Sequence, residues 1–234
     1  MTSAIPGAAS VARDHSDVWV VIPLFNEATV IGGVIEDLNV SFQNVVCIDD
    51  GSRDGSGEVA SRAGAKVVRH PINLGQGAAL QTGFEYALER GATYVVTFDA
   101  DGQHRVIDAC AMLERARAED LAVVFGSRFL DDRTQPGLLK KIVLKTAVWV
   151  TNLTTRTKLT DAHNGLRVIR EDALRMVKLR QDRMAHGTEI VVQLGRTGLP
   201  YAEQPVEVLY TDYSKAKGQS LLNSINILID LVIR

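Results

Sequence analysis

Cysteine is scarce in this sequence, with only Cys47 and Cys110 among 234 residues, and this scarcity excludes a fold built on disulfides. Both cysteines stand in apolar or helical stretches, so we expect them to be reduced core residues of a cytosolic protein. Long apolar runs are missing too, because no stretch reaches the roughly 18 consecutive residues that a membrane-spanning helix needs. The first residues lack the apolar run of a signal peptide, and we expect a flexible N-terminus over 1–16.

A large excess of charge of one sign is also absent. Lysine and arginine number 26 against 28 aspartate and glutamate residues, which gives a net charge of −2. Proteins that bind nucleic acid typically carry a basic excess, so we expect no nucleic-acid partner. The apolar fraction of 46% and the charged fraction of 23% are ordinary for a globular chain of one domain.

Short apolar runs alternate with segments of helical periodicity along most of the chain. Strands are expected over 18–22, 44–48, 65–69, 93–98, 121–125 and 201–209, and helices are expected to open at 26–29 and to cover 56–63, 78–89, 105–117, 171–179 and 188–196. Pro23 is expected to end the first strand. This alternation predicts an α/β fold with a mostly parallel twisted sheet and helices on both faces.

The fourth of these strands runs into Asp99 and Asp101, in the sequence VVTFDADGQH over 95–104. Alternate side chains of a strand face the same way, so two carboxylates one residue apart can approach one site. The two carboxylates would repel each other without a cation, which favours a divalent metal ion or a cationic ligand. A surface turn is the alternative interpretation, because aspartate and glycine are common in turns.

Polar side chains follow the carboxyl ends of several expected strands. They are Asn26, Glu27, Asp49, Asp50, Asp99, Asp101 and Arg128. Ligands bind at that edge of open α/β sheets, so the pattern predicts one site there. The glycines of 50–52 and 75–77 match no phosphate-binding loop motif and are interpreted as strand-to-helix turns. The carboxylate of Asp50 can accept hydrogen bonds from a base or a ribose.

Several stretches carry a resemblance to a known family. In order, they are 23–27 (PLFNE), 49–56 (DDGSRDGS), 73–77 (NLGQG), 99–104 (DADGQH) and 126–128 (GSR). Over about 18–170 the chain resembles the inverting glycosyltransferases of family two, which have the GT-A fold. Gln103 and the stretch 160–167 (TDAHNGLR) are similar to the polyprenyl-phosphate branch, which includes dolichol-phosphate mannose synthase and undecaprenyl-phosphate sugar transferases.

The resemblance implies a role for each matching residue. Nucleotide-sugar binding is implied for Pro23, Phe25, Asn26, Glu27, Asp50, Gln76, Asp99, Ala100 and Asp101; metal binding for Asp99, Asp101 and Gln103; catalysis for Asp101, Arg128, Asp161 and Lys215; and contact with an acceptor phosphate for Arg128, Lys215 and Lys217. The implied cofactor is Mg²⁺ or Mn²⁺, which suits hard oxygen ligands and would act as a Lewis acid on the leaving nucleoside diphosphate. His104 could touch a phosphate, and Glu189 could be a base or a solvated helix residue.

Two departures from the family pattern bear on the acceptor. Many relatives have a lysine where this chain has Gln76, so one cation near the diphosphate is absent. The polyprenyl branch often has the motif R-x-x-G-x-S-K-L, whereas 215–222 reads KAKGQSLL, with Lys215 for the arginine and Leu221 for the lysine. A lysine cannot reproduce the bidentate fork of an arginine. Lys217 is a candidate to compensate.

The catalytic domain is expected over 17–212, and it includes an amphipathic segment over 137–158. Its pattern fits a membrane interface and an ordinary core-facing helix equally well, and the family resemblance favours the interface, since a polyprenyl acceptor enters from a bilayer. Residues 213–234 are expected to form a basic loop and an apolar helix, too short to span a bilayer, that docks on the domain, the membrane or a small membrane protein. A homo-oligomer is possible. We expect a cytoplasmic protein, peripheral at the cytoplasmic face of the plasma membrane.

The sequence therefore predicts an inverting, metal-dependent transfer of a hexose from a nucleotide-diphosphate sugar to a polyprenyl (undecaprenyl) phosphate, in cell-envelope glycan or glycoconjugate synthesis. The alternative is the same donor chemistry onto a sugar or glycan hydroxyl, which would need a nearby carboxylate as a base. A remote alternative is a non-catalytic nucleotide-sugar-binding scaffold. UDP-glucose, UDP-N-acetylglucosamine and GDP-mannose all remain possible donors.

Overall fold

The computed structural model describes residues 15–131, 158–161, 164–181 and 186–209. The elements, in chain order, are β1 (Val18–Leu24), α1 (Ile31–Asn39), β2 (Asn44–Asp49), α2 (Ser56–Arg62), β3 (Lys66–Arg69), α3 (Gln76–Glu89), β4 (Tyr94–Thr97), α4 (Val106–Ala118), β5 (Val123–Ser127), β6 (Arg167–Arg170), α6 (Glu171–Arg175), α7 (His186–Arg196) and β7 (Tyr201–Pro205). Strands and helices alternate along the first half, as the sequence pattern predicts.

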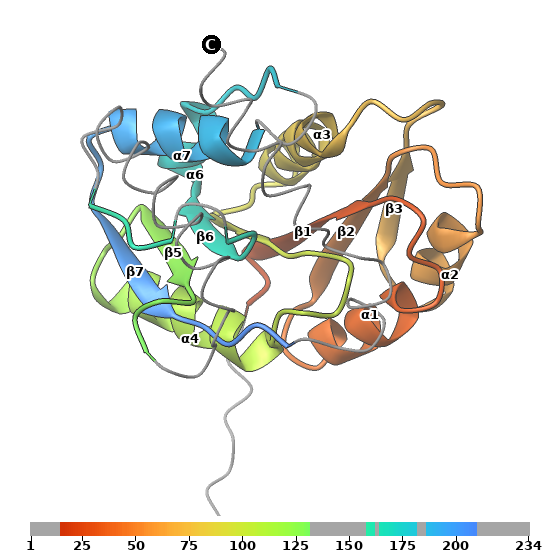
Figure 1. The fold of residues 1–234 in the computed structure, drawn as a ribbon, viewed down its shortest axis with the longest axis horizontal. Helices are drawn as coiled ribbons and strands as arrows, with labels where there is room; N and C mark the ends of the chain where they lie inside the picture. Colours follow the sequence, from red (N-terminus) through yellow and green to blue (C-terminus); the bar gives the residue numbers. More distant parts are fainter. Residues whose placement is uncertain (1–14, 132–157, 162–163, 182–185, 210–234) are drawn as a thin grey trace, which may run out of the picture.

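The strands form one seven-stranded sheet in the order β3-β2-β1-β4-β6-β5-β7. All neighbouring pairs are parallel except those of β6, which runs antiparallel to both β4 and β5. Helices cover both faces of the sheet (Figure 1). The predicted α/β class with a mostly parallel sheet is confirmed.

Alternation along β1 divides the core into two layers. Val18, Val20 and Ile22 pack with the α1 and α4 side, whereas Trp19 and Val21 pack with the α3 side. Because both faces of a central parallel strand are covered, the strand reads as a continuous apolar run. Helix α1 buries Ile31, Val34, Ile35 and Leu38, which is the spacing of a single apolar helix face.

The expected end of the first strand at Pro23 is wrong, because β1 continues to Leu24 and Pro23 pairs with Ile48 of β2. The pairing of β1 with β4 ends at Val21. The carbonyl of Leu24 accepts from Asp50 N on the β2 side, so Pro23 faces the side where β4 no longer pairs. The missing N–H of proline therefore interrupts no ladder there.

Strand β6 is absent from the sequence prediction, which assigned 160–167 only as a motif. The helix expected over 171–179 is shorter, as α6, and the strand expected over 201–209 ends at Pro205. The expected segments at 1–14, at 137–157 and over 213–234 lie outside the described residues. Among the helices that the structure describes, none has the length and apolarity needed to cross a membrane.

Candidate active site

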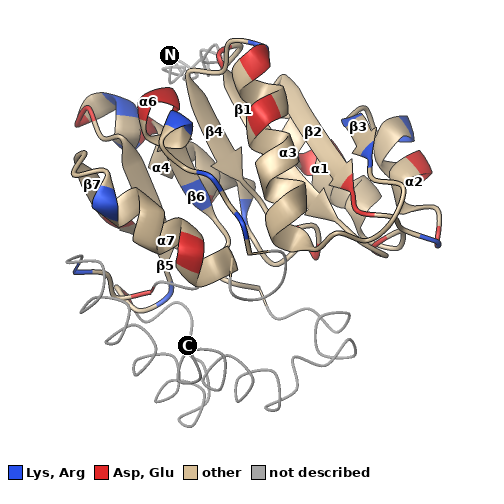
Figure 2. Ribbon diagram, turned by 90° about the horizontal axis from the view of Figure 1, so that it is seen from above, with Lys and Arg blue, Asp and Glu red and all other residues tan. Residues whose placement is uncertain are grey.

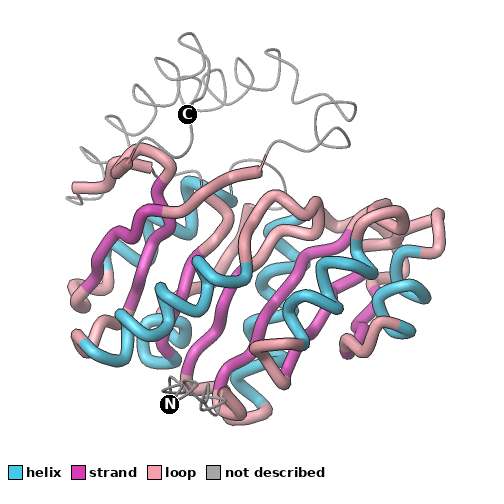
Figure 3. Tube along the Cα trace, turned by 90° about the horizontal axis from the view of Figure 1, so that it is seen from below, coloured by secondary structure: helices cyan, strands magenta, loops and turns pink. Residues whose placement is uncertain are grey.

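The candidate site lies at the edge of the sheet where the parallel strands reach their carboxyl ends. Loops gather along this edge (Figure 3), and acidic residues lie on it at the end of β2 (Figure 2). Residues 25–30 follow β1, 50–55 follow β2, 98–105 follow β4 and Arg128 follows β5. The topology thus brings the sequence motifs to one edge, as the strand-end pattern predicts.

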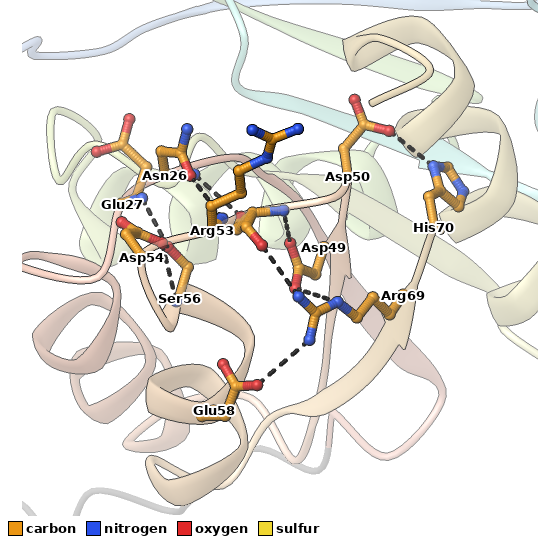
Figure 4. A network of polar contacts seen from close by, with 11 residues as sticks. Asn26, Glu27, Asp49, Asp50, Arg53, Asp54, Ser56, Glu58, Arg69 and His70 are labelled. Atoms are coloured by element: carbon orange, nitrogen blue, oxygen red, sulfur yellow. Dashed lines mark hydrogen bonds and ion pairs between the residues drawn. The ribbon is translucent and has the colours of Figure 1, made fainter. Parts of the chain in front are cut away.

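The loops after β1 and β2 are joined by hydrogen bonds between side chains and backbone (Figure 4). The backbone N–H of Asn26 donates to Ser52 Oγ at 3.0 Å, and that of Glu27 donates to Ser56 Oγ at 2.8 Å. Ala28 N donates to Asp54 Oδ2 at 3.0 Å. Three residues of the DDGSRDGS motif therefore order the neighbouring loop and so place Glu27 at the edge of the sheet.

Asn26 and Asp49 complete this join. Asn26 adopts φ 55°, a left-handed conformation that asparagine tolerates, and its Oδ1 accepts from Arg53 N at 3.0 Å. Asp49 is buried, accepts from Ser52 N at 2.8 Å and lies 3.5 Å from Arg69 Nε. Asp49 therefore holds the turn after β2 and does not face the open edge.

Asp50 is nearly fully buried and binds the turn that precedes α3. Its carboxylate accepts from Leu74 N at 2.9 Å, from Gly75 N at 2.7 Å and from His70 Nδ1 at 2.8 Å. Gly51 next to it has φ +76°, and a Cβ there would lie 2.8 Å from Asn73 N. A glycine is thus required where the two turns touch.

Asp99 is held by positive neighbours. His104 Nε2 lies 2.8 Å from Asp99 Oδ2, and a Cβ on Gly165 would lie 2.1 Å from the same oxygen. Burial alone would raise the pKa of Asp99, but the hydrogen bond from His104 and the positive charges of His104 and Arg167 hold it below its usual value. Asp99 is therefore ionised and fixed in place.

Asp101 has the opposite electrostatic environment. Burial and the negative charge of Asp99 raise the pKa of Asp101 to about 6, and its Oδ1 accepts one hydrogen bond, from Gln103 N at 3.0 Å. The two carboxylates of the D-x-D stretch thus differ in how far the protein stabilises their negative charge. The protein stabilises the ionised form of Asp99, whereas the ionised form of Asp101 would be stabilised by an added cation.

Arg128 is joined to Asp161, which the sequence places 33 residues away. Arg128 Nε and Nη2 donate to the two carboxylate oxygens at 2.6 and 2.8 Å, and Arg128 N donates to Oδ2 at 3.1 Å. The side chain of Asp161 is 0% exposed. This bidentate pair fixes the direction of the guanidinium at the end of β5.

Glu203 of β7 holds the segment that carries Asp161. Its carboxylate accepts from Thr160 N at 2.8 Å, from Thr160 Oγ1 at 3.0 Å and from Asp161 N at 3.1 Å. Burial raises the pKa of Glu203, although the hydrogen bonds from Thr160 and Asp161 act in the opposite direction. Thr160 Oγ1 also lies 2.6 Å from Ser127 Oγ, so β5, β7 and residues 160–161 form one polar unit.

Comparison with known proteins agrees with this geometry. Residues 19–177 match the family model described as glycosyl transferase family 2. The chain belongs to this family. It is therefore a glycosyltransferase, and the family predicted from the five motifs is confirmed.

Two relatives in the family act on lipid phosphates, as their names state. The chain is 29% identical over 227 residues to UDP-N-acetylglucosamine–dolichyl-phosphate N-acetylglucosaminyltransferase of Methanococcus voltae, covering 88% of this chain and 90% of that protein. It is 29% identical over 228 residues to undecaprenyl-phosphate mannosyltransferase of Micrococcus luteus, covering 88% of this chain and 91% of that protein.

A solved structure shares the fold. Glucosyl-3-phosphoglycerate synthase from Mycobacterium tuberculosis, in complex with Mn²⁺, UDP and phosphoglyceric acid, superimposes with a TM-score of 0.64 and 18% identity, covering 92% of this chain and 78% of that chain. The GT-A fold predicted for this chain is confirmed.

Most of the predicted site residues of this family-2 chain lie along one edge. Phe25 is 43% exposed there, Glu27 is buried, and Gln76 is the first residue of α3. Their roles in nucleotide-sugar binding, like those of Pro23 and Ala100, remain predictions. Lys215 and Lys217 lie outside the described residues.

His104 and Glu189, which the sequence analysis names as a possible phosphate contact and a possible base, contact other residues of the protein. His104 bonds Asp99, and Glu189 accepts from the backbone of Arg180 and Gln181 at 3.0 and 2.8 Å. The carboxylate of Glu189 therefore orders residues 180–181. These contacts give both side chains a structural use, and a contact with substrate stays a prediction.

His70, Arg167 and Glu203 carry much of the site and were not predicted from the sequence. Arg167 is buried in β6, and burial lowers its pKa to about 10 against the charges of Asp99 and Asp161. In the sequence Arg167 stands between Leu166 and Val168, and an arginine between apolar residues is an available signal for a buried cation. His70 and Glu203 gave no comparable signal, because their partners are distant in the sequence.

Proposed function

We propose that this family-2 chain transfers a hexose, with inversion, from a nucleotide-diphosphate sugar to a polyprenyl phosphate at the cytoplasmic face of a membrane. The gathering of Asp99, Asp101 and Arg128 at the edge where the parallel strands end carries the proposal. The opposite directions of the pKa shifts of Asp99 and Asp101 support it, because perturbed pKa values are common at functional sites.

The residues after β4 fit a divalent cation. Mg²⁺ is usually held by one or two carboxylates together with the phosphates of its substrate. Asp101, with Gln103 beside it, supplies such a partial set, and no group of three or more acidic, histidine or cysteine ligands gathers among the described residues. Mg²⁺ or Mn²⁺ bound there would stabilise the negative charge that develops on the leaving nucleoside diphosphate.

The proposed reaction is a single displacement at the anomeric carbon. An oxygen of the acceptor phosphate forms the new bond while the bond to the nucleoside diphosphate breaks and the diphosphate keeps the electron pair. A phosphate acceptor is already an anion near neutral pH, so no strong general base is needed. In this proposal, Arg128 neutralises phosphate charge, and Asp161 holds its guanidinium in one direction. The lipid-phosphate acceptors named for two relatives support this choice of acceptor.

The test is to incubate the protein with Mg²⁺ or Mn²⁺, a panel of nucleotide sugars and undecaprenyl phosphate, and to measure glycolipid formation. We expect Asp101→Ala to reduce turnover by about a thousandfold or more, because charge stabilisation in a reaction centre is worth several kcal/mol. Glu36→Gln changes an exposed acid on α1 and should retain full turnover.

The outcomes separate the alternatives. Activity retained in Asp101→Ala would remove the metal assignment. Transfer to a sugar hydroxyl, with none to the lipid phosphate, would show that the acceptor is a hydroxyl. The presence of Leu221 in place of the lysine of the polyprenyl branch favours that alternative. Binding of nucleotide sugar without any transfer would indicate a scaffold.

A further inference from the structure

His70 is a buried histidine that the proposed reaction does not use. Its Nδ1 lies 2.8 Å from Asp50 Oδ1, and its Nε2 lies 3.0 Å from Thr82 Oγ1 of α3. An ionised carboxylate only accepts, so Nδ1 carries a proton, and in the neutral ring Nε2 accepts from the threonine hydroxyl. His70 thereby joins the end of β2 to helix α3, and Figure 4 shows it facing Asp50.

The contacts of Asp50 leave little acceptor capacity. A carboxylate offers about four lone-pair sites, two on each oxygen. Oδ1 accepts from His70 and from Leu74 N, and Oδ2 accepts from Gly75 N. Both sites of Oδ1 are therefore used, and a single site remains on Oδ2.

We propose that His70 is a positioning residue of the nucleotide site, which holds Asp50 so that it offers one acceptor to the base and thereby selects uracil over guanine. This inference rests on the proposed function, in which Asp50 contacts the base of a nucleotide-diphosphate sugar. It adds the identity of the nucleoside diphosphate and the residue that enforces the choice.

The chemistry of the two bases gives the reason. Uracil presents one N–H on its pairing edge, which a single carboxylate site can accept. Guanine presents two adjacent N–H donors, at N1 and N2, which fit a carboxylate with both oxygens available. Guanine would have to displace the His70 or Leu74 donor from Oδ1, and a buried donor left without a partner is unfavourable.

The backbone donors alone would not fix the carboxylate in the same way. Leu74 N and Gly75 N belong to a turn, whereas the imidazole of His70 is anchored through Thr82 to a helix of 14 residues. Loss of the imidazole would free one site on Oδ1 and would remove the contact with α3. The base would then meet a carboxylate that is less fixed and less selective.

The test is to measure the dissociation constants of UDP and GDP by calorimetry, in the presence of Mg²⁺, for the wild-type protein and four variants. We expect the wild-type protein to bind UDP about tenfold or more tightly than GDP. His70→Ala should weaken UDP binding by about tenfold and reduce the UDP/GDP ratio, because one charge-assisted hydrogen bond is lost. His70→Asn places an amide donor near the position of Nδ1 and should restore most of the ratio.

Two further variants separate positioning from folding. Thr82→Val removes the anchor but keeps the imidazole, and it should give an intermediate loss of UDP affinity. His15→Ala removes another buried histidine, whose Nδ1 lies 2.9 Å from Ser41 O. It should lower the melting temperature and leave both dissociation constants unchanged, as a purely structural histidine would.

Each outcome addresses a different statement. Equal or tighter binding of GDP by the wild-type protein would overturn the selection of uracil while glycolipid formation still supports the proposed function. An unchanged UDP/GDP ratio in folded His70→Ala and Thr82→Val would overturn the positioning role. Absence of binding by either nucleotide would overturn the proposed function together with this inference.

Discussion

Two sides of the candidate site are held together by different forces. On the side of β1 and β2, side chains of the DDGSRDGS motif bind backbone N–H groups of residues 26–28. On the side of β5 and β7, the main contacts join charged groups, namely the buried Asp161 and the half-buried Arg128 and Glu203.

The two sides differ in how much stability the removal of one side chain would cost. Each bond of the first side contributes about 1 kcal/mol net, and neighbouring bonds remain when one is removed. On the second side, removing one partner leaves an uncompensated charge in a low-dielectric environment, which costs several kcal/mol. The β1–β2 side is therefore expected to tolerate change, and the β5–β7 side is expected to fail as a unit.

The largest effect is expected for Asp161→Ala. The guanidinium of Arg128 would lose both of its carboxylate acceptors, and the backbone N–H of Arg128 would lose its acceptor too. We therefore expect the free energy of unfolding to fall by about 3–5 kcal/mol. Turnover should fall at saturating donor as well, because the guanidinium loses its fixed direction. Urea denaturation and glycolipid formation measure the two effects.

The matched control is Asp172→Ala, which removes the same side chain from the pair with Arg170. That pair is partly exposed, with side chains 20% and 45% accessible, and such pairs are worth about 1 kcal/mol or less. If Asp161→Ala costs no more than Asp172→Ala, the buried pair does not hold the second side.

A smaller effect is expected on the first side, for Ser56→Ala. Ser56 is buried and its hydroxyl accepts from Glu27 N, so the variant leaves that N–H without a partner at a cost of about 1–3 kcal/mol. The KM for the nucleotide sugar should rise more than kcat falls, because Ser52 and Asp54 still hold the loop. Ser61→Ala changes an exposed serine of the same helix and should be neutral.

The fold followed from the sequence because its signals are local. Apolar runs and helical spacing, as in Ile31 to Leu38 of α1, depend on residues within one element. The edge that carries Asp50, Asp99 and Arg128 followed from topology, because parallel strands end at one edge. The family motifs then assigned the chemistry that the strand pattern left open.

The remaining parts depend on contacts between distant residues. Strand β6 has only four residues and begins and ends in arginine, so its pattern is not that of a buried strand, and its place between β4 and β5 is fixed by tertiary pairing. Glu203 reaches Thr160 across 43 residues of chain. No periodicity within a short window encodes such pairs.

The smallest effect concerns pH, and it should have opposite signs on the two sides. Asp54 is on the first side: burial would raise its pKa, but hydrogen bonds from Ser56 and from Ala28 N hold it below the ordinary value of 3.8. As the pH rises, Asp54 therefore loses its proton at a lower pH in the folded state than in the unfolded state. The stabilisation by ionised Asp54 is present above about pH 4 and is lost as the pH falls. Asp54→Asn should reduce the increase of stability with pH between about pH 3 and 5.

Glu203 on the second side has a pKa that burial raises above the ordinary value of 4.5. The unfolded state loses this proton first, so the ionisation of Glu203 lowers stability as the pH rises above about 4.5. Glu203→Gln removes that titration, and its free energy of unfolding relative to wild type should improve from pH 4 to pH 7, even if the amide costs stability at every pH by opposing Thr160 N. Urea denaturation at pH 3, 4, 5, 6 and 7 measures both trends. For each variant, the difference in free energy of unfolding from wild type is plotted against pH. Slopes of the same sign for the two variants would mean that the hydrogen bonds from residues 160–161 outweigh the effect of burial on Glu203. Both sides would then be stabilised by ionised carboxylates in the same way.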